Sequence, residues 1–222
     1  MVLQQQCDSV TIIIVLCNNN KCIGARLGLS LCVLHKCNCG AEVDAEARHA
    51  MVCKNAPGRM ARHQALNDVV CRAFISAGIP ASKEPAGLCT RDGKRPDGLS
   101  LIPWQNGKPL AWDVTVGATL AESYVEAAAR ESGAVAEQAA QRKVEKYRDA
   151  FPNYCFQPIA VENLGAMNSS AVDFINTLGR RISSVSGEDK ESAFLFQRIS
   201  ITIQRFNSIL LFESFPHDDH DQ

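Results

Sequence analysis

The chain has 222 residues, of which 46% are hydrophobic and 21% are charged, so its composition is that of a soluble globular protein with a sizeable core. The formal net charge of −1 excludes the strongly basic composition of many nucleic-acid-binding proteins. The charge is unevenly distributed, because residues 213–222 contain four acidic side chains, and without them the net charge would be +3.

Residues 1–36 have no clear periodicity, and we assign them no function. The apolar run Val10–Cys17 is much shorter than the roughly 20 residues that span a bilayer, so we expect a buried strand and no membrane contact. No basic segment precedes this run, so the sequence shows no export signal. Outside the metal cluster described next, we expect the cysteines to be reduced core residues of an intracellular protein.

A cluster of metal-ligand residues lies in residues 37–58. Cys37 and Cys39 are separated by one residue, and Gly40 permits a tight turn after them. His49 and Cys53 are four residues apart, which places them on one face of a helix. Four such ligands are the number that a closed tetrahedral zinc site requires. The pattern predicts a structural zinc knuckle; chance clustering in a cysteine-rich chain is the alternative.

A helix is predicted after residue 58, because apolar residues recur at helical spacing between positions 66 and 75. Gly78 and Pro80 are expected to end it. Arg62 and His63 lie near its start, within a modest excess of basic residues over 54–72. Two interpretations of this pair remain open: a solvated first turn, or contacts with the phosphates of a nucleic acid.

Residues 81–116 are expected to form a three-stranded antiparallel unit, with a strong hairpin signal at Asn106-Gly107. In the last strand the large apolar side chains fall on one face and Asp113 falls on the other. The carboxylate of Asp113 therefore either faces solvent or lines a site.

Residues 119–150 are rich in Ala, Glu, Gln and Arg, which favours a helix, and Gly133 is expected to divide it. In its second half, small alanines share a stripe with Lys143 and with Lys146 and Tyr147. This stripe can pack closely against a sheet and direct Lys143 along it. Lysines on a helix are usually solvated, which is the alternative here.

The remaining segments complete a mixed α/β fold. A strand is expected at 156–164, and helices are expected at 171–183 and 193–212. The last segment also fits a strand, because Ile199, Ile201 and Ile203 alternate, but the absence of Gly and Pro favours a helix. The predicted fold class is α/β, with a small central sheet flanked by helices.

Two acidic residues and a lysine suggest phosphodiester cleavage. Mg²⁺ takes oxygen ligands and keeps several waters, so two or three carboxylates can hold it. Asp97 and Asp113 are the natural ligands, and Glu84 is a candidate third ligand. A nearby lysine can stabilise the developing anion or orient the attacking water.

These residues, taken in order, resemble the restriction-like endonuclease domain of site-specific non-LTR retrotransposons, a branch of the PD-(D/E)xK nuclease superfamily. The resemblance covers roughly residues 37–165. It rests on the Cys-Cys-His-Cys cluster, an Arg-His pair at a helix start, an Arg-Pro-Asp signature and a second acid in a D-V-T-V strand. The residues concerned are Cys37, Cys39, His49, Cys53, Arg62, His63, Arg95, Pro96, Asp97 and Asp113.

The resemblance implies a Mg²⁺-dependent endonuclease with a structural Zn²⁺ that nicks target DNA for element integration. It implies DNA as a partner, with element RNA or a reverse transcriptase as further candidates, and a nuclear location. Arg62, His63 and Arg95 are then nucleic-acid contacts. The implied organisation is an N-terminal segment of unknown role (1–36), a zinc knuckle (37–58), an endonuclease core (59–165), C-terminal helices packed on it (166–212) and an acidic tail (213–222).

The chain departs from the superfamily pattern at Thr115, where a lysine is expected two residues after the second acid. The family moves this lysine onto the following helix, which Lys143 matches, with Lys146 left open as the alternative. A chain of 222 residues cannot contain a polymerase, so a truncated or domesticated element remnant is also considered. The alternative functions are a catalytically inactive, zinc-containing nucleic-acid-binding module and a purely structural domain.

Overall fold

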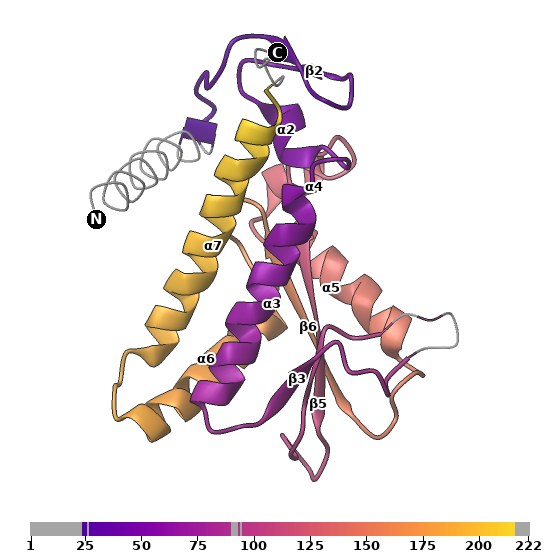
Figure 1. The fold of residues 1–222 in the computed structure, drawn as a ribbon, viewed down its shortest axis with the longest axis vertical. Coiled ribbons are helices and arrows are strands. Elements are labelled where there is room, and N and C mark those ends of the chain that lie inside the picture. Colours follow the sequence, from indigo (N-terminus) through magenta and orange to yellow (C-terminus); the bar gives the residue numbers. More distant parts are fainter. Residues whose placement is uncertain (1–23, 26, 90–92, 94, 216–222) are drawn as a thin grey trace, which may run out of the picture.

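The computed structural model describes residues 24–25, 27–89, 93 and 95–215 (Figure 1). The strand expected at Val10–Cys17 lies outside the described residues. The elements in chain order are β1 (His35–Lys36), β2 (Glu42–Val43), α2 (Arg48–Val52), α3 (Gly58–Ser76), β3 (Ala81–Lys83), β4 (Gly98–Ser100), β5 (Leu110–Gly117), α4 (Val125–Arg130), α5 (Ala134–Tyr147), β6 (Cys155–Glu162), α6 (Ser169–Ser186) and α7 (Glu191–Glu213).

The central sheet has the strand order β3-β4-β5-β6. The first three strands pair antiparallel, as expected, and β6 pairs parallel with β5. The predicted hairpin turn is confirmed, since Asn106 (φ 49°) and Gly107 (φ 72°) both adopt the left-handed conformation of a tight hairpin turn. A parallel neighbour requires a crossover connection, which α4 and α5 supply between β5 and β6. The sheet is therefore mixed.

Helices cover both faces of the sheet. On one face, α3 and α6 pack against β5 and β6, and α7 packs across α3 and α6 (Figure 1). The alternation predicted for β5 is confirmed, because Leu110, Trp112 and Val114 all belong to the main apolar core on that face. On the opposite face, α5 packs through three alanines against Ala160 of β6. Asp113 lies on this second face of β5.

The helix predictions hold with two refinements. Gly133 (φ 91°) separates α4 from α5 as expected, but residues 118–124 form turns rather than helix. The segment that also fitted a strand is the 23-residue helix α7. Ile199 and Ile203 are buried there, whereas Ile201 is 63% exposed, so the helical rather than the alternating pattern meets the core.

A second apolar cluster lies at the N-terminal end of the described chain. It contains Val43, Ala47 and Met51, together with Leu211 from the end of α7. Side chains between residues 24 and 36 also pack against it, so this segment belongs to the same unit as the Cys/His cluster. Figure 1 shows that the long helices α3 and α7 run side by side from this unit to the sheet.

α7 extends one residue into the segment that the sequence assigned to the acidic tail. This residue, Glu213, accepts a hydrogen bond from the backbone N–H of Gly58 at the start of α3. Among the described residues, no helix is both long and apolar enough to cross a membrane.

Candidate active site and metal centre

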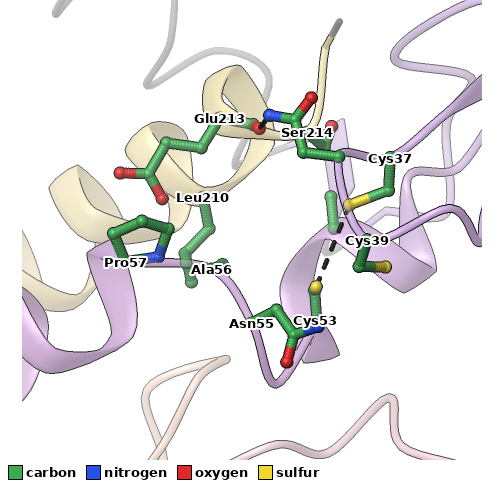
Figure 2. Close-up of a pocket in the computed structure, with 11 residues that line it drawn as sticks. Cys37, Cys39, Cys53, Asn55, Ala56, Pro57, Leu210, Glu213 and Ser214 are labelled. Atoms are coloured by element: carbon green, nitrogen blue, oxygen red, sulfur yellow. Dashed lines mark hydrogen bonds between the residues drawn. The ribbon is translucent and has the colours of Figure 1, made fainter.

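The four predicted zinc ligands converge. Cys37 and Cys39 lie in the turn between β1 and β2, His49 lies on α2, and Cys53 follows that helix directly. The Sγ atoms of Cys37 and Cys53 are 3.8 Å apart, and Cys39 Sγ lies 3.1 Å from His49 Nε2. All four ligand atoms lie within 4.8 Å of one another. Figure 2 shows the sulfur atoms of Cys37 and Cys53 pointing toward each other.

This geometry fits a tetrahedral metal ion. Ligand atoms about 2.0–2.3 Å from zinc lie about 3.3–3.8 Å from one another, close to the distances seen here. Burial raises the pKa of the Cys37 thiol to about 11, whereas the backbone N–H of Ala41 lowers the pKa of Cys39 to about 7. A metal ion would take the thiolates, so its uptake releases protons. The cluster could bind a metal such as zinc, and the four protein ligands fill a structural site.

Asp97 directly precedes β4 and lies beside Asp113 of β5. The backbone N–H of Asp97 donates to Trp112 O at 2.9 Å, and Asp97 Oδ2 accepts a hydrogen bond from Val114 N at 2.6 Å. Asp97 therefore contacts the residues on both sides of Asp113. The charge of Asp97 also contributes to the raised pKa of Asp113, after the larger effect of burial.

Asp113 is buried, with 2% of its surface exposed. Lys143 Nζ lies 2.5 Å from Asp113 Oδ1, and the Tyr147 hydroxyl lies 2.8 Å from Asp113 Oδ2. Both contacts lower the pKa of Asp113 and oppose the effect of burial. The side chains come from one face of α5, since Lys143 and Tyr147 are four residues apart.

The structure distinguishes between the two candidate lysines. Lys143 reaches the carboxylate, whereas Lys146 Nζ lies 2.7 Å from the Tyr147 hydroxyl. That hydroxyl also lies 2.9 Å from the carbonyl oxygen of Arg95. Lys146 therefore bonds the same hydroxyl that contacts Asp113 Oδ2. Thr115, at the position where the superfamily places its lysine, shares the face of Asp113 and carries no charge.

Two residues of α3 hold Asp97 in place. His63 Nε2 lies 3.0 Å from Asp97 Oδ2 and 3.1 Å from Val114 O. A carbonyl oxygen can only accept, so Nε2 carries a hydrogen that is shared between these two acceptors. The hydrogen bond to Asp97 raises the pKa of His63.

One turn further along α3, Asn67 contributes a bridge that the sequence did not identify. Its Nδ2 donates to Asp97 O at 2.9 Å, and its Oδ1 accepts from Trp112 Nε1 at 2.8 Å. The sequence could have identified Asn67 through its spacing of four residues from His63, which puts both side chains on the face of α3 that meets the sheet.

Three other predicted site residues lie elsewhere. Glu84 follows β3 and pairs with Arg95 at 2.5 Å, and both side chains are substantially exposed. The ion pair of these two side chains is distinct from the Lys143–Asp113 pair, although the backbone carbonyl of Arg95 accepts from the Tyr147 hydroxyl. Arg62 was expected on the surface, but it is 2% exposed and donates to Asn207 Oδ1 at 3.0 Å. The reason is its position on the face of α3 that packs against α7, so it is not available to DNA in this structure.

No protein-family model matches this chain, and no curated protein matches it either. The functional argument therefore rests on the arrangement of the side chains.

Proposed function

We propose that this protein is a metal-dependent endonuclease that cleaves phosphodiester bonds in DNA. It would belong to the restriction-like endonucleases of the PD-(D/E)xK superfamily found in non-LTR retrotransposons. The observation that carries the proposal is the 2.5 Å distance between Lys143 Nζ and Asp113 Oδ1, with Asp97 bound to the backbone on both sides of Asp113. Two carboxylates and a lysine from three separate elements therefore meet at one place.

The donor set fits a hard divalent cation. Asp97 and Asp113 would hold Mg²⁺ through carboxylate oxygens, which are the ligands that this ion prefers. Asp97 bonds His63 and the backbone N–H of Val114 through Oδ2, so Oδ1 is its candidate ligand atom. Burial is the main cause of the raised pKa of Asp113, and repulsion by the Asp97 carboxylate adds to it; a cation between the two carboxylates would relieve this repulsion. When bound, Mg²⁺ would stabilise the charge on the phosphate and acidify a bound water.

Lys143 has two roles in this proposal. Its ammonium group lowers the pKa of the buried Asp113 and so favours the ionised carboxylate, which offsets part of the effect of burial. With 26% of its side chain exposed, it also stands where a phosphate oxygen or an attacking water can reach it. The helix α5 thus supplies the cation that Thr115 cannot.

The resemblance also motivates the wider proposal. DNA is the proposed substrate, the Cys/His cluster is the proposed structural zinc site, and a nuclear protein of a mobile element, or a remnant of one, is the proposed context. Element RNA and a reverse transcriptase remain proposed partners.

A nicking assay tests the function. Supercoiled plasmid incubated with the protein and Mg²⁺ should convert to the open-circular form, and Asp97→Asn and Asp113→Asn should each reduce the rate by at least about 100-fold. Far-UV circular dichroism of each variant controls for folding. Nicking by both variants at the parental rate would reject the assignment of the two aspartates.

The same assay distinguishes an endonuclease from the second candidate function, a nucleic-acid-binding module without activity. Plasmid binding without nicking, in either Mg²⁺ or Mn²⁺, would favour a nucleic-acid-binding module with an inactive site.

A further inference from the structure

We propose that the pocket between the Cys/His cluster and Asp97 binds the sugar–phosphate backbone of DNA beside the scissile phosphate. The pocket is lined by Lys54, Ala56, Pro57, Arg59, Met60 and His63. We call it the backbone pocket. The inference rests on the proposed function, because that function identifies the neighbouring carboxylates as the place of cleavage.

The charge of the backbone pocket suits a polyanion. Lys54 and Arg59 are positively charged, and none of the described residues that line the pocket is acidic. Its volume of about 530 Å³ lies within the roughly 300–1,000 Å³ of pockets that take organic ligands, so it has room for more than a single inorganic ion. Basic side chains that contact phosphates account for most of the affinity of proteins for DNA.

The backbone pocket leads directly to the proposed cleavage site. His63 lines the pocket, and its Nε2 lies 3.0 Å from Asp97 Oδ2. Arg59 and His63 are four residues apart on α3, so both side chains lie on the same face of that helix. A DNA strand that contacts first Arg59 and then His63 would therefore run toward the carboxylates of Asp97 and Asp113.

The Cys/His cluster positions one side of the backbone pocket. Arg59 Nη1 donates to the carbonyl oxygen of Cys53 at 3.4 Å. Figure 2 shows Asn55, Ala56 and Pro57 linking Cys53 of the cluster to the start of α3. A guanidinium group that is already held in this way loses less conformational entropy when it binds a phosphate. The backbone of Cys53 thus helps to position Arg59 in the pocket.

Fluorescence anisotropy with a labelled 20-base-pair DNA duplex, without added divalent cations, tests the proposal. Lys54→Ala and Arg59→Ala should each weaken binding by about 3- to 10-fold and reduce the slope of log K against log salt by about one. Arg198→Ala is the matched control, because it also removes one positive charge. Arg198 is exposed and lies in the N-terminal part of α7, whereas the C-terminal end of that helix packs on the Cys/His unit. This variant should bind DNA like the parent protein.

Lys54 is exposed, so its removal tests the pocket even if Arg59→Ala disturbs the fold. Parental affinity and salt slope in both pocket variants would overturn the proposal, as would equal losses in Arg198→Ala or the absence of any DNA binding by the parent protein.

A plasmid nicking assay on the same preparations tests the endonuclease activity separately from DNA binding by the backbone pocket. Reduced binding by the pocket variants, together with a parent protein that does not nick, retains the backbone pocket and rejects the endonuclease. A parent protein that nicks, with pocket variants that bind and nick equally well, rejects the backbone pocket alone.

Discussion

Asp113 is a carboxylate placed where solvent cannot stabilise its charge. Burial is the largest cause of its raised pKa, and the neighbouring Asp97 adds to it. Lys143 and Tyr147 act in the opposite direction through direct contacts with the two carboxylate oxygens. The pKa of this residue therefore also depends on α5, which belongs to the crossover connection between β5 and β6.

Replacing Lys143 by Met tests this balance, because methionine retains most of the apolar stem and removes the charge. Nicking should fall by at least about 100-fold. The free energy of unfolding at pH 7 should fall by about 1–3 kcal/mol, because a buried carboxylate loses its partner. Urea unfolding followed by circular dichroism measures the second effect.

The pH dependence of this variant follows from the sign of the shift. Without Lys143, the pKa of Asp113 in the folded state should rise further above its unfolded value. Stability is then greatest at low pH, where the neutral acid is buried without penalty, and it is lost as pH rises through the folded-state pKa. Relative to the parent protein, Lys143→Met should therefore recover stability as pH falls toward the acidic range.

Lys146→Ala is the comparison for Lys143→Met, since Lys146 is exposed and donates to the Tyr147 hydroxyl, whereas Lys143 pairs with Asp113 itself. It should change stability by less than about 0.5 kcal/mol. Strong loss of nicking in Lys146→Ala, with a Lys143→Met variant that remains active, would assign the catalytic cation to Lys146 instead.

At the scale of elements, strand β4 can approach β5 closely because Gly98 has no side chain. Gly98 pairs with Trp112, which is fully buried. A Cβ atom at Gly98 would lie 1.9 Å from Cζ2 of Trp112, far inside van der Waals contact. The same indole donates to Asn67, which in turn binds Asp97. The fit between these two strands therefore supports the site as well as the core.

Gly98→Ala should consequently lower the free energy of unfolding by about 2–4 kcal/mol, because the indole must shift within a packed core. Nicking should fall with it, since Trp112 and Asn67 position Asp97. Thermal unfolding and the plasmid assay measure the two effects.

Gly87→Ala provides the comparison, because nothing described lies within 4 Å of a Cβ atom at Gly87. Equal stability of both alanine variants would show that Trp112 adapts without cost.

The elements themselves were largely predictable from local patterns. Helical spacing predicted α3, and the stop signals at Gly78 and Pro80 agree with its end at Ser76. Alternation along β5 placed Asp113 opposite Trp112. The turns at residues 118–124 were not anticipated, because an alanine- and glutamate-rich composition favours helix wherever tertiary packing does not forbid it.

At the scale of the whole molecule, α3 and α7 join the Cys/His unit to the sheet. Glu213 at the end of α7 binds the first residue of α3, and Arg62 binds Asn207, about 1.7 turns before Glu213 on α7. Leu211 and Phe215 extend the same contact into the N-terminal apolar cluster. The Cys/His cluster is thus anchored on both long helices, although the apolar cluster around it is separate from the main core.

Loss of the metal should therefore loosen one end of the molecule and leave the sheet intact. Cys53→Ser should abolish stoichiometric zinc binding and increase amide hydrogen exchange in α2 and at the C-terminal end of α7. The amides of β5 and β6 should remain protected. Metal analysis and hydrogen exchange measured by mass spectrometry provide the readouts.

Cys89→Ser is the matched control, because Cys89 is exposed and lies outside the cluster. Equal zinc content in the Cys53→Ser and Cys89→Ser proteins would contradict the assignment of the metal centre.

The sequence by itself determined most of the helices and strands of the sheet, the face of β5 on which Asp113 lies, and the identity of the Cys/His cluster. These depend on short-range spacing, which periodicity and ligand chemistry express directly. Only the tertiary structure placed Lys143 against Asp113 and Lys146 against the Tyr147 hydroxyl, buried Arg62 beneath α7 and paired Glu84 with Arg95. Each of these outcomes depends on which face of a helix meets a distant strand or helix, and that is set by the packing of the whole core.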